Sequence, residues 1–375
     1  MKALGIHIFA GGFSVGVRDA GFELLGHLEL SNYGAETSRK NLGIPVVENH
    51  SDWGAWDVPA CNTDLIYSNP PCAPWSSAGS KIIGDKRNYD AGFDPRDERV
   101  KCVEQAFEVF ERLLPPVFMW ESVTRCWTAG RPMVDMYAQR ALDLGYSFTV
   151  VMADGFDCGV TQHRKRAFFV AHKIEIPWVS PKESRPEDAS KTVGDVLLSV
   201  EGHLESQGLD PADERCAKKP WGICMECLKA TPPGKKLRDA YMRIYGETRY
   251  NKEKNRYGGR PGFLYTRLDR AKHCPTITGS PAFFHPDHDR TLTLREMGAL
   301  CGYPLDYEFV GSINNCYAQV AQAVMPPAGR WVASQVRKGL ERDETVTVPT
   351  YSCTDFIDGR RKEFGIKLDP PRLRV

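Results

Sequence analysis

Short apolar runs alternate with amphipathic stretches through the first half of the chain. The runs lie close to glycines, prolines or acids, at residues 3–9, 26–30, 65–67, 117–120, 148–152 and 167–171. Runs of this length beside turn-forming residues are typical of buried strands. Helical spacing of apolar residues falls between them, at Ser14–Gly21, Arg99–Leu114 and Pro132–Leu144. The alternation predicts an α/β fold with a doubly wound sheet.

The pattern changes after Pro177. Proline, glycine, lysine and short apolar pieces dominate up to about Cys274, and the alternation of strand and helix stops. Helical spacing returns from Thr291, with further helices expected at Tyr317–Ala323 and Gly329–Leu340. We therefore expect one domain over residues 1–178, a smaller inserted domain over 179–274, and a return to the first domain over 275–375 with C-terminal helices.

Composition places the chain among cytoplasmic globular proteins. Its 375 residues, 42% of them hydrophobic, are enough to bury a sizeable core. No apolar run reaches the roughly 18 residues of a membrane span, and the start lacks the cleavage site of a signal peptide. Because the 12 cysteines are spread along a chain without a signal, we expect reduced thiols.

Charge is unevenly distributed, although the net charge is only +1. One stretch is rich in basic residues and also carries five tyrosines. Taken alone, such a stretch is more often a solvated surface, and a polyanion-binding surface is the alternative. Its basic residues are Lys229, Lys235, Lys236, Arg238, Arg243, Arg249, Lys252, Lys254, Arg256, Arg260, Arg267, Arg270 and Lys272.

The loops after the first strands suggest a nucleoside site, because ligands of open parallel sheets bind beyond the carboxyl ends of the strands. Phe9 to Gly16 contains glycines that let the backbone approach a ligand at a helix N-terminus. Glu29 could accept hydrogen bonds from ribose hydroxyls, and Asp52 with Trp53 could hold an adenine. Each of these signals alone also fits a turn or an exposed acid.

The loop after the strand at 65–67 carries more specific chemistry. Two prolines stiffen the backbone immediately before Cys72 and should present its thiol outward. Glu121 follows the strand at 117–120 and should reach the same edge of the sheet. Arg164 and Arg166 stand at alternate positions before the strand at 167–171, which places both on one face.

These segments, in this order, resemble the DNA cytosine-5 methyltransferase family over most of residues 5–178 and 275–335. Coincidence is negligible because so many motifs follow in sequence. The motifs are Phe9 to Gly16, Glu29, Asp52, Pro70-Pro71-Cys72, Asp94-Pro95-Arg96, Glu121-Ser122-Val123, Gly159 to Arg166, Arg290 to Glu296 and Tyr317 to Val324.

The resemblance implies a Rossmann-like S-adenosylmethionine-dependent domain and a target-recognition domain at roughly 179–274. It implies a monomeric enzyme, bacterial or phage-encoded, that acts on double-stranded DNA and not at a membrane. Whether a restriction enzyme accompanies it stays open. Implied cofactor contacts are Phe9, Gly11, Gly12, Gly16, Glu29, Asp52, Trp53, Asn69, Pro71, Arg99 and Gln322. Implied DNA contacts are Ser76, Gln162, Lys252, Lys254 and Arg256.

The same resemblance implies a mechanism that the residue chemistry supports. Cys72 would add to C6 of a flipped cytosine as a thiolate. A free thiol has a pKa of about 8.5 and is mostly protonated at neutral pH, so the positive charge of the arginines should favour its ionisation. Glu121 would protonate N3. Arg166 would bind the cytosine O2 and Arg164 a phosphate or the nucleophile loop, although these two roles could be exchanged.

Departures from the family pattern cluster near the methionine end of the cofactor. The cofactor loop is two residues shorter than usual, Gln322 replaces an asparagine, and Arg99 replaces a leucine. Neutral drift around ordinary S-adenosylmethionine is the favoured interpretation. The alternative is a pocket for carboxy-S-adenosylmethionine, whose carboxylate Arg99 could bind, with transfer of a carboxymethyl group.

Three other functions compete. An amino methyltransferase shares Asn69-Pro70-Pro71 but expects an aromatic residue where Cys72 stands. A tRNA cytosine-5 methyltransferase would use the same scaffold, and a catalytically silent DNA-binding module would not need Cys72. We expect no catalytic metal, although Cys216, Cys224 and Cys227, with Cys274, His203 or His273, are candidates for a structural zinc site.

Overall fold

The computed structural model divides the chain into two compact units. The first unit comprises residues 1–158, 164–185 and 323–375, and the second comprises 159–163 and 186–322. The structure describes residues 1–48, 62–72, 75, 98–184, 191–209, 223–256, 265–277, 283–357 and 361–367.

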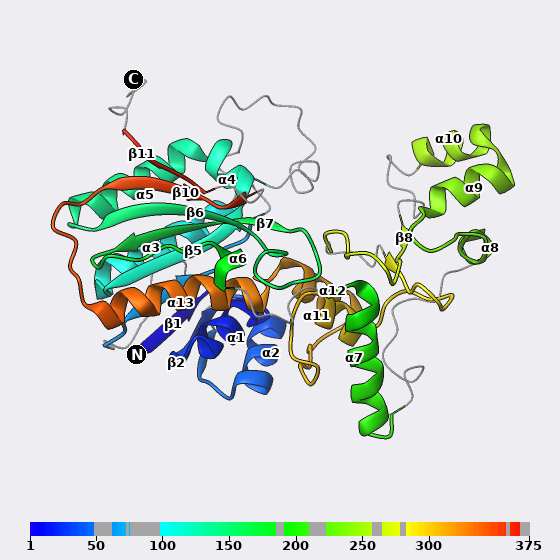
Figure 1. Ribbon diagram of the computed structural model, residues 1–375, viewed down its shortest axis with the longest axis horizontal. Helices are drawn as coiled ribbons and strands as arrows, with labels where there is room; N and C mark the ends of the chain where they lie inside the picture. The colour runs from blue at the N-terminus through cyan, green and yellow to red at the C-terminus, as the bar shows by residue number, and fades with distance from the viewer. Residues whose placement is uncertain are drawn as a thin grey trace. The chain divides into compact units, whose positions relative to one another are not determined.

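A nine-stranded sheet forms the centre of the first unit (Figure 1). Its order is β11-β10-β6-β7-β5-β4-β1-β2-β3, and β1 to β5 run parallel to one another. This confirms the predicted α/β fold with a parallel-dominated sheet. The strands are β1 (Lys2–Ile6), β2 (Glu23–Glu29), β3 (Val46–Glu48), β4 (Leu65–Ser68), β5 (Val117–Val123), β6 (Ser147–Asp154), β7 (Lys165–His172), β10 (Tyr351–Asp355) and β11 (Lys362–Gly365).

Strand β7 interrupts the parallel order, since it pairs antiparallel with both β5 and β6. Residues 155–164 join β6 to β7, and Asp154 accepts hydrogen bonds from the backbone N–H groups of Phe156 and Arg164, near the two ends of this loop. The antiparallel direction brings the N-terminal end of β7 to the edge of the sheet where β5 ends. Arg166 thereby lies opposite Val123.

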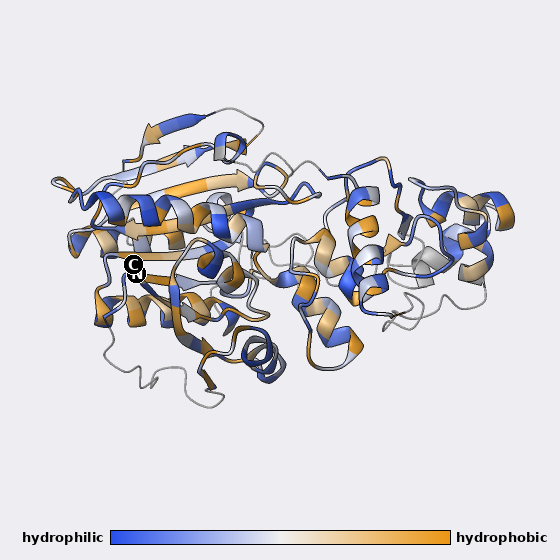
Figure 2. Ribbon diagram, turned by 60° about the horizontal axis from the view of Figure 1, so that its bottom comes forward, coloured by the Kyte–Doolittle hydropathy of each residue, from blue (hydrophilic) through white to orange (hydrophobic). Residues whose placement is uncertain are grey.

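Helices cover both faces of this sheet. One face packs against α3 (Lys101–Leu113), α4 (Thr124–Thr128) and α5 (Arg131–Asp143). The other face packs against α1 (Gly12–Asp19) and α13 (Pro326–Arg342), where Phe168 contacts both Phe13 and Trp331. Figure 2 shows hydrophobic strands between helices of mixed hydropathy. The unit also contains α2 (Asn32–Leu42), α6 (Pro181–Ser184) and the 3-10 turn η1 (Glu98–Val100).

The end of the chain differs from the expectation of C-terminal helices. The expected helix at Gly329–Leu340 is present as α13, but β10 and β11 follow it. Residues near Tyr351 have a short apolar pattern, and Pro349 interrupts it. Pairing of β10 with β6 over five positions, rather than local pattern, makes this segment a strand.

The second unit is built mainly from short helices. Thr192 and Thr293 begin two of them with reciprocal capping boxes, formed with Asp195 and Glu296. A small core in the basic stretch buries Cys227, Leu228 and Tyr241. The elements are α7 (Val193–Ser206), α8 (Ile223–Lys229), α9 (Leu237–Tyr245), α10 (Glu247–Arg256), β8 (Thr266–Arg267), β9 (Phe283–Phe284), α11 (Leu294–Leu300) and α12 (Ile313–Gln322).

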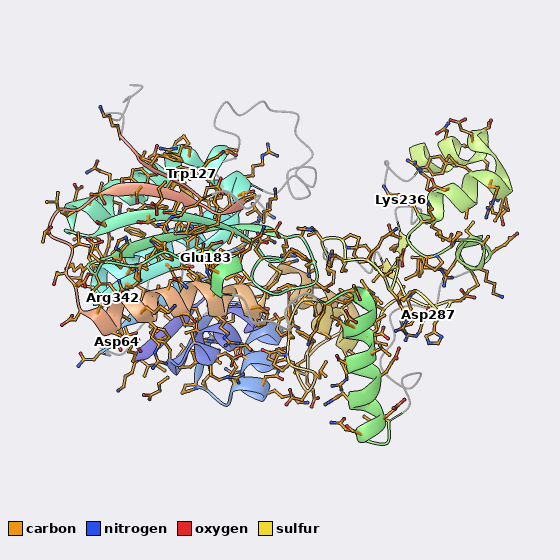
Figure 3. The ribbon with its side chains drawn as sticks, in the orientation of Figure 1. Asp64, Trp127, Glu183, Lys236, Asp287 and Arg342 are labelled. Carbon is orange, nitrogen blue, oxygen red and sulfur yellow. The ribbon has the colours of Figure 1, made fainter. Side chains whose placement is uncertain are left out.

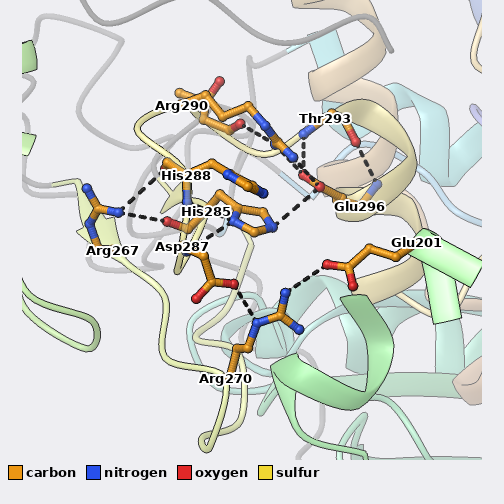
Figure 4. Close-up of polar contacts among 10 residues, drawn as sticks. Glu201, Arg267, Arg270, His285, Asp287, His288, Arg290, Thr293 and Glu296 are labelled. Carbon is orange, nitrogen blue, oxygen red and sulfur yellow. Dashed lines mark hydrogen bonds and ion pairs between the residues drawn. The ribbon is translucent and has the colours of Figure 1, made fainter. Parts of the chain in front are cut away.

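Charged side chains connect the segments of this unit internally (Figure 4). The Arg267 guanidinium donates to the backbone oxygens of Leu228 and Pro286 and to Asp289. Arg290 donates to both carboxylate oxygens of Glu296, at 2.8 and 2.7 Å. The pair of Arg290 and Glu296 connects the segment before α11 to that helix. The second compact unit extends to Gln322, beyond the Cys274 boundary expected from the pattern.

Candidate active site

The loop after β4 holds the candidate nucleophile. Pro70 and Pro71 follow Asn69, and Cys72 comes next with a half-buried side chain. The Trp75 backbone N–H donates to the Cys72 carbonyl at 3.1 Å. No motif predicted a role for Trp75, yet its side chain is almost fully buried and a Cβ at Gly130 would lie 2.6 Å from its indole nitrogen. Trp75 therefore anchors the nucleophile loop beside α5.

Glu121 is buried near the end of β5, where its carboxylate has two partners. Asn69 Nδ2 donates to Oε2 at 2.8 Å, and Arg166 Nε lies 2.6 Å from Oε1. Arg166 comes from the neighbouring strand β7, as a diagonal neighbour of Glu121 across the pair. Burial raises the pKa of Glu121, and Arg166 and Arg164 partly oppose that rise. Asn69, expected at the cofactor, thus orients the candidate acid.

The structure brings Cys72, Glu121, Arg164 and Arg166 together in one unit. Burial raises the pKa of the Cys72 thiol, and the nearby charge of Glu121 raises it further. The charges of Arg166 and, less strongly, Arg164 lower this pKa. The arginines therefore favour the thiolate as expected, but the net shift is upward, opposite to the expectation. The physical reason is that desolvation of the Cys72 thiol outweighs the two positive charges.

The expected cofactor loop has an unusual backbone. His7 and Phe9 have positive φ angles of 55° and 57°, and Gly11 has 73°. Positive φ at residues other than glycine is uncommon and concentrates at functional sites. The Phe9 N–H donates to Glu29 Oε2 at 2.6 Å, while Oε1 accepts from the backbone N–H groups of Leu30 and Ser31. The loop is thus tied to the acid expected to bind ribose.

Other expected cofactor contacts have varied surroundings. Gly12 begins α1 and Gly16 lies farther along it, where a Cβ would come within 2.4 Å of the Arg330 nitrogen and the Pro326 oxygen. Packing against α13 therefore accounts for Gly16. Arg99 is half-buried in η1 of the first unit, and Gln322 is exposed at the end of α12 in the second.

Among the expected DNA contacts, Gln162 is fully buried inside the second unit. Its side-chain amide donates to the Leu300 carbonyl at 3.2 Å, and its carbonyl accepts from the Ile277 N–H at 3.1 Å. These contacts indicate a structural side chain. Lys252 is exposed on α10, which also contains Lys254 and Arg256. Three other expected residues lie outside the described residues, namely Asp52, Trp53 and Ser76.

The candidate zinc ligands are only partly visible. Cys216 lies outside the described residues, Cys224 falls on α8, and Cys227 is buried in the small core. In the described part of the chain, no three His, Cys, Asp or Glu side chains gather so that they could hold a metal. The same part contains no helix with the length and apolar composition to cross a membrane.

Comparison with solved structures defines the class of fold. The structure matches one titled as a "putative DNA modification methyltransferase" encoded within an E. coli prophage, with a TM-score of 0.64 and 17% identity. The match covers 91% of this chain and 99% of that one. The first unit therefore has a methyltransferase fold.

Sequence comparison defines the family. The family model described as C-5 cytosine-specific DNA methylase matches residues 3–338, and the chain belongs to this family. Relatives include the "Putative type II methyltransferase M.MJ0563P" of Methanocaldococcus jannaschii, 25% identical over 91% of this chain and 100% of its own length. Type II methyltransferase M1.HphI of Haemophilus parahaemolyticus is 26% identical over 88% of this chain and 84% of its own length. Membership implies a methyltransferase that uses S-adenosylmethionine and acts on DNA.

Proposed function

We propose that the chain transfers a methyl group to C5 of a cytosine flipped out of double-stranded DNA, through a covalent adduct with Cys72. The observation that carries this proposal is the juxtaposition of a half-buried thiol with a buried carboxyl group that is held by Asn69 and Arg166. Such a thiol can add to an electron-poor ring carbon, and the carboxyl can supply the proton that the addition needs.

Each residue has a defined part in the proposed reaction. The Cys72 thiolate forms a bond to C6 while Glu121 donates a proton to N3, which makes C5 nucleophilic. C5 would then take the methyl group as the S–CH3 bond of the sulfonium breaks, a base would remove the C5 proton, and the C6–S bond would break to restore the thiolate. N3 would return its proton to Glu121, which restores the acid. The raised pKa of Glu121 suits a proton donor, and its cause is burial. Arg166 keeps that carboxyl in place and can reach the cytosine O2.

Residues of the first unit fit S-adenosylmethionine, which supplies an electrophilic methyl group on a sulfonium. Glu29 offers a buried carboxylate fixed by three backbone N–H groups, at the end of β2. The turn at Phe9 and Gly11 has positive φ angles at the start of α1. A fixed acid beside a glycine-containing turn is the arrangement that nucleoside-binding sheets use for ribose.

Recognition of DNA is assigned to the second unit. The described basic side chains of its α8–α10 segment are exposed, and Figure 3 labels one of them, Lys236. They are Lys229, Lys235, Lys236, Arg238, Arg243, Arg249 and Lys252. Phosphate contacts from such residues would position the duplex without reading its sequence. The target sequence would then depend on other side chains of this unit.

The proposed function is tested by incubating the purified full chain with duplex DNA and S-adenosylmethionine, followed by bisulfite sequencing and nucleoside mass spectrometry. We expect 5-methylcytosine at one sequence context. A parallel incubation with tRNA separates the RNA alternative. Absence of modified cytosine in both polymers, with DNA binding retained, would favour the silent binding module.

The same assay addresses the alternative cofactor. Incubation with carboxy-S-adenosylmethionine alone should give no product if the departures at Arg99 and Gln322 are neutral drift. Appearance of 5-carboxymethylcytosine, and its loss in Arg99→Leu, would support the alternative group transfer.

A further inference from the structure

A buried polar cluster lies at the start of α1, and the proposed reaction does not use it. Ser14 Oγ is 2.6 Å from His27 Nε2 and 2.8 Å from Tyr67 Oη. The three side chains come from α1, β2 and β4, and each is at most 2% exposed. Buried polar groups that are hydrogen-bonded to one another restrict how the elements carrying them can move.

Gly5 makes this contact possible. It lies on β1, between the two other strands, and is paired with His27 on one side and with Tyr67 on the other. A Cβ at Gly5 would lie 2.7 Å from His27 Cδ2 and 2.6 Å from Ile8 Cγ1. The absence of a side chain on the middle strand therefore gives the imidazole ring the room to meet Ser14.

The cluster connects the parts of the proposed site. Ser14 is the third residue of α1, directly after the turn that contains Gly11. His27 precedes Glu29 by two residues on β2, and Tyr67 precedes Cys72 by five on the β4 side. A hydrogen bond at Ser14 thus fixes the start of the helix relative to the two strands that lead to the acid and to the nucleophile.

We propose that Ser14, His27 and Tyr67 are positioning residues that hold the cofactor loop in its binding conformation over the ends of β2 and β4. This inference rests on the proposed function. A loop held in advance loses less conformational entropy when the ligand binds, so the cluster should strengthen cofactor affinity. Burial lowers the pKa of His27 to about 3, which keeps the ring neutral and able to share a proton with Ser14.

A second buried cluster, in which a hydroxyl also contacts a histidine and another hydroxyl, provides a matched control. Thr149 Oγ1 lies 2.9 Å from His172 Nε2 and 3.1 Å from Ser352 Oγ. It joins β6, β7 and β10, and His172 lies at the opposite end of β7 from Arg166. Removing a hydroxyl there should cost similar stability without affecting the cofactor loop.

The test is calorimetric titration of S-adenosylmethionine into the full chain and its variants, with thermal unfolding of each. We expect Ser14→Ala to raise the cofactor Kd roughly five- to twentyfold, as loss of buried hydrogen bonds implies. Tyr67→Phe should raise it less, since the bond between Ser14 and His27 remains, and Ser14→Thr should restore much of the affinity. Thr149→Val should lower Tm comparably but leave the cofactor Kd within about twofold.

Kinetics separate positioning from general damage. Ser14→Ala should raise KM for the cofactor while kcat at saturating cofactor and DNA affinity stay close to wild type. Two results would overturn the positioning role and leave the proposed function intact. One is wild-type cofactor affinity in Ser14→Ala and Tyr67→Phe, and the other is an equal loss of cofactor affinity in Thr149→Val. A wild-type chain that does not bind the cofactor would overturn the proposed function as well. If Ser14→Ala does not fold, the cofactor Kd of the volume-conserving variant Tyr67→Phe is compared with that of Thr149→Val instead.

Discussion

The two compact units carry charge in different ways. In the first unit, a few buried groups hold one another in fixed geometry, as Asn69, Glu121 and Arg166 do. In the second, the buried pairs around Arg267 and Glu296 connect its own segments, while most of the basic side chains on α8–α10 face solvent. Reaction chemistry requires particular residues at particular places, whereas a surface for a polyanion requires only enough positive charge.

The largest expected effect concerns Cys72, the proposed nucleophile in the first unit. Cys72→Ser should lower turnover on the order of 10³-fold or more, because an alcohol at neutral pH is a far weaker nucleophile than a thiolate. Methyl transfer from labelled S-adenosylmethionine measures the loss, and a gel-shift assay should show DNA binding near wild type. Substantial turnover by the pure variant would contradict the assignment of Cys72.

Glu121→Gln should lower kcat by roughly 10²-fold, since an amide cannot donate the proton that N3 needs. A matched control is Glu104→Gln on α3, which also removes a carboxylate from an ion pair, with Arg140 at 2.7 Å. That variant should keep nearly full activity. Equal losses in the two variants would indicate damage to the fold rather than to the proton donor.

These two assignments also show how far sequence alone predicts the site. Although their roles in the reaction stay predictions, the grouping of Cys72, Glu121 and the arginines was predictable because a proline-stiffened thiol and charged residues at strand ends are unusual combinations. Trp75 was not, because only the contact with Gly130 reveals its anchoring role. The cluster of Ser14, His27 and Tyr67 depends on strand register, which apolar pattern does not specify.

In the fold, too, some elements follow from the sequence pattern and others depend on contacts between distant segments. Most strands and helices of the first unit follow from their apolar patterns, but β10 does not, because its partner β6 lies about two hundred residues earlier in the chain. Gln162 belongs to a motif that resembles a family signature, yet its contacts are internal to the second unit. A motif identifies a segment more reliably than it identifies what each side chain in it contacts.

Two glycine substitutions compare the packing of the units. Gly16→Ala should destabilise the first unit by about 1–3 kcal/mol, because the new methyl group would meet the backbone of α13. Gly202 on α7 has no atoms near its Cβ position, so Gly202→Ala should stabilise the second unit by up to about 1 kcal/mol. Denaturant unfolding measures both free energies. Similar effects of the two changes would show that α1 does not pack tightly on α13.

The smallest effect is expected at the basic helix α10. Replacing Lys252, Lys254 and Arg256 by glutamine should weaken DNA binding and reduce the salt dependence of log K by up to about 0.9 for each lost phosphate contact. The sequence that is methylated should not change, because phosphate contacts do not read bases.

A control variant for that experiment carries glutamine at three exposed basic residues of the first unit, Lys40, Lys338 and Arg342. It should bind DNA with nearly wild-type affinity and slope. If both variants lose affinity equally, the positive charge acts through the whole protein rather than through α10.

The proposed covalent bond between Cys72 and the target base can be tested directly with duplex DNA that contains 5-fluorocytosine at the methylated position. Fluorine at C5 cannot leave as a proton does, so the adduct should persist after methyl transfer. Mass spectrometry of the trapped complex should place the modified nucleotide on the peptide that contains Cys72, and Cys72→Ser should form no such complex. A trapped base on another residue, or methylation of normal DNA with no trapping of the fluorinated duplex, would contradict covalent catalysis by Cys72.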